Sequence, residues 1–553
     1  MKRLIYNIKR IPLFVSLLTI SFFLQGQDDI SKPHSSAITP ERIAVLPEGE
    51  RTAWPQYYDR SQSILNSDKA VLAAELKANN LSAPLPAFND DPNGLHIPKR
   101  AELSWFSKPE ARAIADAIVS FQTPSGGWSK GVGFNSGLRK PGMHWTTKAD
   151  GWYYVGTFDN GATTGQLIAL SKFHQATKDP KYAAAFTKGL DYIFVAQYPN
   201  GGWPQNYPLV GWYHDAITFN DNAMTNVVQF LKDVAEKEEY SFVDKQRREK
   251  ARIAFSAGVS CILKAQIKEN GELSAWCSQH DPLTLAPTPG RSFEPASVSG
   301  WEGANVVSFL MSIDSPSPEI RKAVEGVVLW FQKVKVTGIE IQSKLNNAGG
   351  RMFVAVPNPA APPVWARFYE LKTNRPIFLD RQSKIYYTMS ELDQSGDGRG
   401  YHWYVTQPGG MLARYAAWHE KWNPEPGRIT LHARDVAIKG KNARLENESN
   451  IGYWSDPDTS FEWQADIPAG VYLVKMNYAL APGQEGSEIQ IKVGDAVFKV
   501  TPPATGGWED YRLMELGKIE IKKDGKVLVE LKALSKKNGF IMNMAAVKLA
   551  KED

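Results

Sequence analysis

The chain has 553 residues, and ordinary domain sizes predict about two or three folding units rather than one compact core. Its formal net charge is only +5 with no concentrated basic stripe, which argues against nucleic-acid binding and leaves an anionic ligand open. The two cysteines, Cys261 and Cys277, exclude a disulfide framework and a zinc-type ligand spacing. Either they form one bridge after export, or they lie buried as two small apolar side chains.

The N-terminus has the pattern of a secretory signal peptide over residues 1–26. Basic residues through Arg10 precede an apolar run from Ile11 to Leu24. This run is short for a transmembrane helix and no later run approaches twenty apolar residues, so we expect a secreted or periplasmic protein with no membrane span. Residues 27–99 are polar with scattered Pro and one helix-like run, Ser67 to Ala78, and are interpreted as a linker and lead-in.

Residues 100–424 alternate long helical patterns with Gly- and Pro-rich loops. Three helical runs end alike, at Gln122, Gln197 and Gln266, and each is followed by a Gly-containing loop and a Trp; a weaker copy ends at Gln332. Each interval holds about two helices with their loops. Repeated helical hairpins predict an (α/α) barrel or toroid, whose loops gather on one face and form the cleft.

Residues 428–553 change to short alternating segments separated by Pro, Gly, Asn and Asp turns. This pattern predicts a β-sandwich of the jelly-roll or galactose-binding-like type. From that architecture we expect a carbohydrate-binding module, with a purely structural appendage as the alternative. Trp454 and Trp508 are the candidate exposed aromatics, and each is equally suited to closing the core.

Two Asp-Asn pairs, Asp159-Asn160 and Asp221-Asn222, each open a helical pattern. A single such pair is usually a helix N-cap. Two copies at equivalent positions of successive hairpins instead indicate facing carboxylates, which repel unless a cation lies between them. Hard oxygen ligands of this kind suit Ca²⁺.

Three arginines complete the candidate site, Arg291, Arg367 and Arg381. Arginine pairs bidentately with carboxylates, so an acidic sugar polymer fits this set. Structural ion pairs with nearby Asp or Glu are the alternative for each. For Lys130, Asn160 and Asn222, capping or solvation is the preferred interpretation.

Five segments resemble the pectate lyases of polysaccharide lyase family 10, a resemblance that covers roughly residues 100–424. They are Gln197 to Leu209, His214 to Met224, Trp276 to Asp281, Arg367 to Phe378 and Gly400 to Tyr404. The resemblance implies an (α/α) barrel and calcium-assisted anti-β-elimination on α-1,4-polygalacturonate or pectin, which leaves 4,5-unsaturated oligogalacturonides.

The resemblance also implies roles for individual residues. Asp159 and Asp221 match the acidic pair that holds Ca²⁺ and through it the uronate carboxylate, where the cation acts as a Lewis acid. Arg291 matches the arginine that takes the C5 proton, and Arg367 and Arg381 match positions that clamp substrate carboxylates. An arginine base predicts activity that rises into alkaline pH.

Two other functions remain as alternatives. A toroidal glycoside hydrolase would use an Asp or Glu pair with water and leave no double bond. A non-catalytic polysaccharide-binding protein would bind without turnover. We expect the protein to be a monomer.

Overall fold

The computed structural model describes residues 36–91, 94–148, 151–269, 271–345, 351–395, 401–423, 427–446 and 449–552. The predicted signal peptide lies outside these residues. Among the residues described, no helix is both long enough and apolar enough to cross a membrane.

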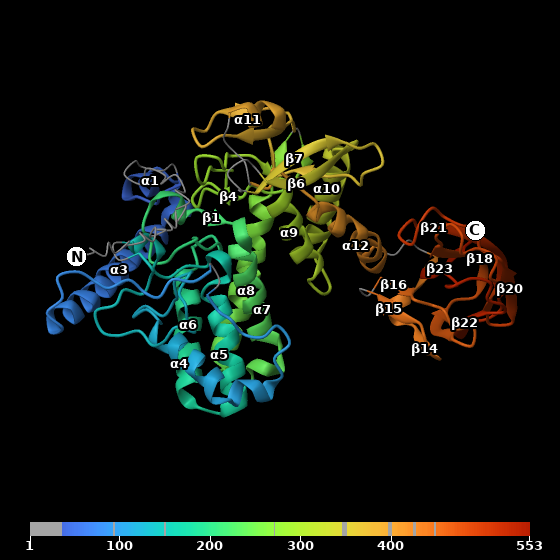
Figure 1. Cartoon of the computed structure of the whole chain (residues 1–553), viewed down its shortest axis with the longest axis horizontal. Coiled ribbons are helices and arrows are strands. Elements are labelled where there is room, and N and C mark those ends of the chain that lie inside the picture. The colour runs from blue at the N-terminus through green and yellow to red at the C-terminus, as the bar shows by residue number, and fades with distance from the viewer. Residues whose placement is uncertain are drawn as a thin grey trace, which may run out of the picture.

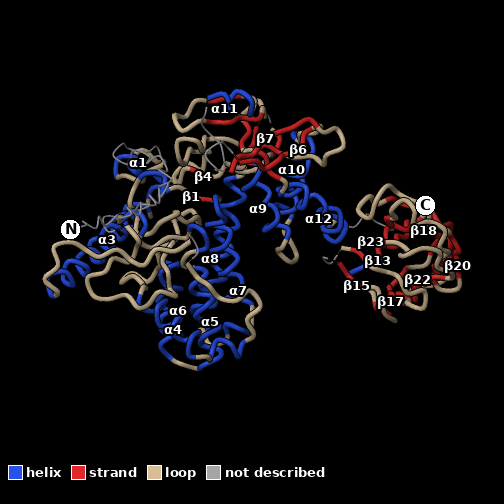
Figure 2. The backbone as a smooth tube through the Cα atoms, viewed as in Figure 1, coloured by secondary structure: helices blue, strands red, loops and turns tan. Residues whose placement is uncertain are grey.

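A large helical part is followed by a smaller β part, and α12 leads from one to the other (Figures 1 and 2). The helices are α1 (Pro40–Ala44), α2 (Glu48–Arg51), α3 (Trp54–Ala78), α4 (Pro109–Ser120), α5 (Thr164–Thr177), α6 (Pro180–Ala196), α7 (Ala223–Glu236), α8 (Lys245–Ala265), α9 (Gly300–Met311), α10 (Pro318–Val334), α11 (Met389–Ser395) and α12 (Gln407–Trp422). Helices α5 and α6 pack as a hairpin, as do α7 with α8 and α9 with α10. The predicted toroid of helical hairpins is confirmed.

The predicted Gln–Gly–Trp repeat corresponds to a repeated set of hydrogen bonds. The Gln122 side-chain amide donates to Gly126 O at 2.8 Å and to Ala185 O at 2.9 Å, which ties its loop to α6, the second helix of the following hairpin. Gln197 and Gln266 make the equivalent pairs of bonds. The indoles that follow donate back to their own helices, from Trp128 to Ile118 O, from Trp203 to Ile193 O and from Trp276 to Ile262 O. These bonds hold successive loops at the same end of the hairpins.

Short strands lie at this end of the helical part. They are β1 (Ile217–Thr218), β2 (Lys268–Glu269), β3 (Glu272–Leu273), β4 (Gln279–His280), β5 (Val298–Ser299), β6 (Ile339–Leu345), β7 (Arg351–Pro357), β8 (Trp365–Ala366), β9 (Phe368–Tyr369), β10 (Pro376–Leu379), β11 (Ile385–Tyr386) and β12 (Tyr404–Val405). The largest sheet has the order β11-β10-β9-β5. Antiparallel pairing of β9 with β5 places the loop before α9 beside the arginine-bearing segment 365–369.

The described part of the lead-in packs on the helical core. Helix α3 begins at Trp54, well before the expected helix-like run, and Trp54 and Tyr57 are buried. The Tyr57 hydroxyl donates to Ala196 O at 2.8 Å. This helix therefore completes the apolar core rather than leading up to it.

The C-terminal part is a sandwich of two antiparallel sheets. The first has the order β15-β16-β23-β18-β21, with β13 paired to β23, and the second has the order β14-β17-β22-β19-β20. The strands are β13 (Arg428–His432), β14 (Ala437–Lys439), β15 (Arg444–Glu446), β16 (Asn450–Gly452), β17 (Ser460–Ile467), β18 (Gly470–Ala479), β19 (Ile489–Val493), β20 (Ala496–Val500), β21 (Arg512–Ile521), β22 (Gly525–Ala533) and β23 (Asn543–Lys551). Alternate residues of the strands bury a separate apolar core. The predicted β-sandwich is confirmed.

Two open alternatives are decided by burial. Trp454 is fully buried and closes the sandwich core, so it is not an exposed sugar contact, whereas Trp508 is half-buried. Cys261 and Cys277 are both buried and unbridged. They fill the core as small apolar side chains.

Candidate active site

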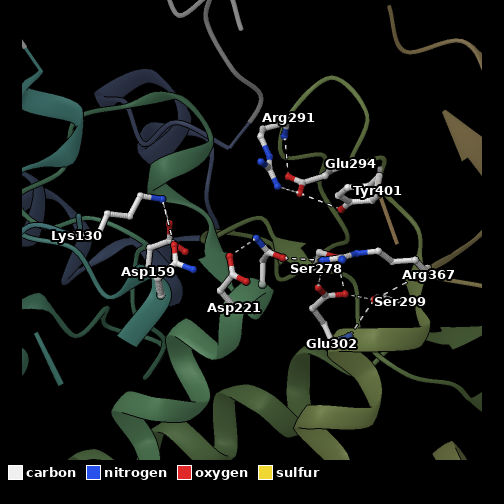
Figure 3. Close-up of polar contacts among 12 residues, drawn as sticks. Lys130, Asp159, Asp221, Ser278, Arg291, Glu294, Ser299, Glu302, Arg367 and Tyr401 are labelled. Atoms are coloured by element: carbon white, nitrogen blue, oxygen red, sulfur yellow. Dashed lines mark hydrogen bonds and ion pairs between the residues drawn. The ribbon is translucent and has the colours of Figure 1, made fainter. Parts of the chain in front are cut away.

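The two acidic loops lie side by side at the loop end of the hairpins (Figure 3). Asp159 opens the 3₁₀ turn η3 (Asp159–Gly161) before α5, and Asp221 lies in η5 (Asn220–Asn222) before α7. Asn160 and Asp221 have φ of 51° and 50°, a left-handed backbone that Asn and Asp adopt more readily than other non-Gly residues. The two turns therefore correspond with Asn160 in the place of Asp221, so the two Asp-Asn pairs are one residue out of register. The paired acids predicted from the sequence are nevertheless brought together on adjacent turns.

Asp159 is almost fully buried and makes an ion pair. The Lys130 ammonium donates to Asp159 Oδ2 and, at 3.4 Å, to Asn160 Oδ1. The other oxygen, Oδ1, is buried and has no hydrogen-bond partner in the part of the chain described. The sequence-based interpretation of Lys130 as a capping or solvated residue is wrong, because this side chain neutralises the buried carboxylate.

Asp221 reaches solvent but lies among other acids. Desolvation by the surrounding protein and the negative charges of Asp159 and Glu302 raise its pKa to about 6, against the opposing effect of Lys130 and Arg367. The Asn220 amide donates to Asp221 Oδ2 at 3.1 Å. Excess negative charge at Asp221 is what a bound cation would relieve.

Arg367 is buried beside these acids. Its Nη2 donates to Glu302 Oε1 at 2.7 Å and to Asn220 Oδ1 at 3.1 Å, so Asn220 links it to Asp221. Burial lowers the pKa of Arg367, but the combined negative charges around it, led by Glu302, outweigh burial and the net pKa is raised. The guanidinium also lies 4.8 Å from the Trp301 ring and 4.7 Å from the Tyr401 ring.

Glu302 is the buried anchor of this arrangement. It lies in the first turn of α9, whose N-cap Ser299 bonds its backbone N–H. Its Oε2 accepts from the Ser299 hydroxyl and, at 3.2 Å, from the Ser278 hydroxyl. With both oxygens occupied, Glu302 fixes the orientation of Arg367 (Figure 3).

Arg291 makes a second ion pair, with Glu294. Its Nη2 donates to Glu294 Oε1 at 2.5 Å, and the Tyr401 hydroxyl donates to the same oxygen at 3.4 Å. The Glu294 side chain is 2% exposed and that of Arg291 is 33% exposed. Burial lowers the pKa of Arg291, but Glu294 outweighs it, and the net pKa of the guanidinium is raised.

Arg381 is placed by a contact with an aromatic ring. It is exposed, follows β10, and lies 5.7 Å from the centre of the Phe293 ring, which Arg291 also faces at 4.8 Å. Phe293 in turn packs edge-on against Tyr401. Arg381 thus joins the Arg291 side of the site through a shared aromatic ring.

The donor set suits a hard divalent cation. Asp159 offers a buried, unpartnered oxygen and Asp221 an exposed carboxylate, and both are ligand types that Ca²⁺ prefers. Lys130 occupies the remaining Asp159 oxygen. Another group of possible ligands in the described chain, Asp90, Asp91 and His96, lies elsewhere on the lead-in.

Sequence reasoning missed Glu294, Glu302 and Tyr401. Glu294 stands three residues after Arg291, a spacing from which the pair was foreseeable. Glu302 and Tyr401 are separated from their partners by 65 and 107 residues. Tyr401 lies in the noted segment Gly400 to Tyr404, but no local pattern assigns either residue to its partner.

The sequence matches known families over both parts. A profile of the pectic acid lyase family matches residues 122–412, more than half of the chain, and a domain family of unknown function, DUF5077, matches residues 436–553. A search of curated proteins gives no match.

Solved structures with similarity to the chain include a family 10 polysaccharide lyase from Cellvibrio cellulosa and a mutant of it in complex with trigalacturonic acid. Each is 30% identical, with 57% of this chain and 95% of that chain covered and a TM-score of 0.48. A family 35 carbohydrate binding module from Clostridium thermocellum is 18% identical over 23% of this chain and 98% of its own, with a TM-score of 0.20.

Proposed function

The chain belongs to the pectic acid lyase family, and on this premise we propose that it is an exported, calcium-dependent enzyme that cleaves α-1,4-polygalacturonate by anti-β-elimination. The observation that carries the proposal is the juxtaposition of two acidic turns with two arginine ion pairs, one buried and one partly exposed, in one site (Figure 3). Carboxylates for a cation and arginines for uronate carboxylates are the groups that this polymer requires. The complex of the Cellvibrio enzyme with trigalacturonic acid supports the same substrate class.

The acidic and basic side chains have different proposed roles. Asp159 and Asp221 would hold Ca²⁺, which when bound neutralises the uronate carboxylate and makes the C5 proton more acidic. Arg367, held by Glu302, and Arg381 are proposed to bind substrate carboxylates. Arg291 is proposed to take the C5 proton; the C5–H electrons then form the C4–C5 double bond as the C4–O4 bond breaks, and the leaving chain takes up a proton.

The ion pair with Glu294 sets a condition on the role of Arg291. A base must be neutral before it accepts a proton, and Glu294 favours the charged guanidinium. Only a small neutral fraction is then present near pH 7, so turnover is expected to increase with pH.

A second proposed function is carbohydrate binding by the β-sandwich. Tyr453 and Phe540 are exposed large aromatics, and their rings lie 6.2 Å apart. Trp508 packs edge-on against Phe540, and the Arg444 guanidinium lies 3.9 Å from the Tyr453 ring. Exposed aromatics gathered from different loops, next to a cation, suit a sugar ring. Tyr453→Ala should weaken retention of the protein on a polysaccharide affinity gel, and unchanged retention would rule out this surface.

The activity is tested by ultraviolet absorbance of the unsaturated uronide during incubation with polygalacturonate, with calcium and then with a chelator. A calcium-dependent increase in absorbance, larger at alkaline pH, supports the proposal. Reducing ends without that absorbance would indicate a glycoside hydrolase instead. Retention on polygalacturonate without any product would indicate a binding protein.

A further inference from the structure

Two short turns of nearly the same sequence precede the two acidic loops. Gly151-Trp-Tyr-Tyr leads into η2 (Trp152–Tyr154), and Gly211-Trp-Tyr-His leads into η4 (Trp212–Asp215). Each turn is followed within a few residues by Thr-Phe and then by Asp159 or Asp221. The repeat therefore supplies an aromatic turn with each acidic residue, and the proposed chemistry uses neither turn.

The two turns pack against each other. The His214 ring of the second turn lies 6.0 Å from the Tyr153 ring and 6.2 Å from the Tyr154 ring of the first. The Asn206 side chain donates to Tyr153 O, and its backbone N–H donates to His214 O at 3.2 Å. One residue thus ties both turns together, and their rings form a single aromatic cluster.

Hydrogen bonds to buried groups hold the second turn in place. The buried Asp215 carboxylate accepts the backbone N–H groups of Gly211 and Ile38, both at 2.9 Å. His214 Nδ1 lies 2.7 Å from Gln205 Oε1. These bonds hold Trp212 in a left-handed backbone conformation, with φ of 58°. For a bulky residue that conformation is unfavourable by about 1–3 kcal/mol, and surroundings that enforce it are typical of binding sites.

The cluster adjoins the groups assigned to the reaction. Burial is the main reason that the pKa of the Tyr213 phenol is raised, and the charges of Glu294, Arg291 and Asp159 also act on it. Gln205, whose side chain contacts His214, accepts the N–H of Phe158, the residue before Asp159, at 2.9 Å. The Tyr213 phenol is thus near enough to these groups for their charges to act on it. Its neighbour Trp212, 4.2 Å away between ring centres, and Tyr153 are half-buried, so part of each ring is accessible.

We infer that the two Gly-Trp-Tyr turns form an aromatic platform on which a uronate ring of the polymer stacks, at a subsite next to the reacting one. This inference rests on the proposed function for the class of sugar. A pyranose ring has a face of C–H groups, which matches the negative face of an aromatic ring, while the carboxylates at its edge are left to the arginines. The platform would bind the polymer without taking part in proton transfer.

The test compares Trp212→Ala with Trp212→Phe, which keeps a flat ring, and with Trp105→Ala as a matched control. Trp105 is also a half-buried Trp in a 3₁₀ turn, η1 (Leu103–Ser107), but its neighbour Phe106 packs on Phe173 near the far end of α5. Steady-state kinetics on polygalacturonate and retention on a polygalacturonate gel in chelator are measured for each. Circular dichroism checks folding.

We expect Trp212→Ala to increase KM and weaken retention about tenfold with little change in kcat, since that is the usual consequence of losing a Trp contact. Trp212→Phe should recover most of the loss, and Trp105→Ala should match the wild type. A lower kcat at unchanged KM would overturn the platform, because the turn would then only position reacting groups.

The remaining outcomes are also decisive. If Trp212→Ala does not fold, Tyr153→Ala on the first turn is judged by the same criteria. If the wild-type protein makes no product, the proposed activity fails, but gel retention still tests the platform. Weaker retention of Trp212→Ala supports it, and equal retention rejects it.

Discussion

Arg367 and Glu302 form a buried ion pair across 65 residues of sequence, with Nη2 and Oε1 2.7 Å apart and side-chain exposures of 10% and 1%. The pair joins the first turn of α9 to the segment 365–369, whose strand β9 pairs with β5 just before that helix. Removal of one partner leaves a buried charge uncompensated, which is much more unfavourable than the loss of an exposed pair. Both the stability and the geometry of the site therefore depend on Glu302.

Glu302→Gln is expected to destabilise the protein by about 3 kcal/mol and to reduce kcat/KM at least about tenfold, because Arg367 loses its counter-charge. Urea unfolding and the absorbance assay measure the two effects. Glu249→Gln, which breaks the exposed Arg252–Glu249 pair, is the control and should change neither. Unchanged stability of Glu302→Gln would show that the carboxylate is not needed to balance Arg367.

Asp221→Asn is expected to reduce turnover at least about 100-fold while the free energy of unfolding stays close to that of wild type. The side chain is exposed and Asn tolerates the left-handed backbone, so folding is spared, whereas a carboxylate ligand is lost. Calcium binding by calorimetry should weaken in parallel. The control is Asp314→Asn, an exposed acid outside the site. Near wild-type turnover of Asp221→Asn would reject the proposed metal site.

Lys130→Met is expected to increase calcium affinity about threefold to tenfold in the absence of substrate. The ammonium occupies Asp159 Oδ2 and repels a second cation, and Met retains most of the side-chain length. Lys140→Met, an exposed lysine of the same loop region, is the control for a change in net charge. Weaker calcium binding by Lys130→Met would mean that Lys130 is needed to shape the acidic turn.

Most of the architecture was accessible from local pattern, because the Gln and Trp residues of each repeat bond within their own loop or to the adjacent helix. The acidic pair was also accessible, since Asp-Asn occurs twice in the sequence, although the two copies are one residue out of register in the turns. The arginine partners were not: Glu302 and Tyr401 reach their partners only through the packing of distant loops. Lys130 was misjudged because nothing near it in sequence shows that Asp159 is buried beside it.

The pH dependence of activity tests the proposed base. Wild-type kcat/KM should increase up to and beyond pH 9, because the neutral fraction of a base grows about tenfold per pH unit below its pKa. Glu294→Gln removes the charge that raises the pKa of Arg291, so the rising limb should shift to lower pH by at least about one unit, even if the maximum falls. A limb at the same pH in both proteins would exclude Arg291 as the titrating group.

The pH dependence of stability tests the buried His280. Burial lowers its pKa to about 4, although a hydrogen bond to Leu285 O acts in the opposite direction, and the Cys277 N–H donates to Nε2. The His280 imidazole takes up a proton near pH 6.5 in the unfolded chain but only near pH 4 in the folded protein. The contribution of neutral His280 to stability is therefore complete above pH 6.5 and is lost as the pH falls.

Between pH 6.5 and pH 4 the free energy of unfolding should therefore decrease by about 3 kcal/mol less in His280→Gln than in wild type, as measured by urea unfolding at each pH. Asp215 acts in the opposite direction, since burial raises its pKa to about 7 and its contribution becomes more favourable as the pH falls. Because Asp215 is present in both proteins, its effect cancels in the difference. Parallel stability curves for wild type and His280→Gln would show that the imidazole is protonated in the folded protein, contrary to its bonding to the Cys277 N–H.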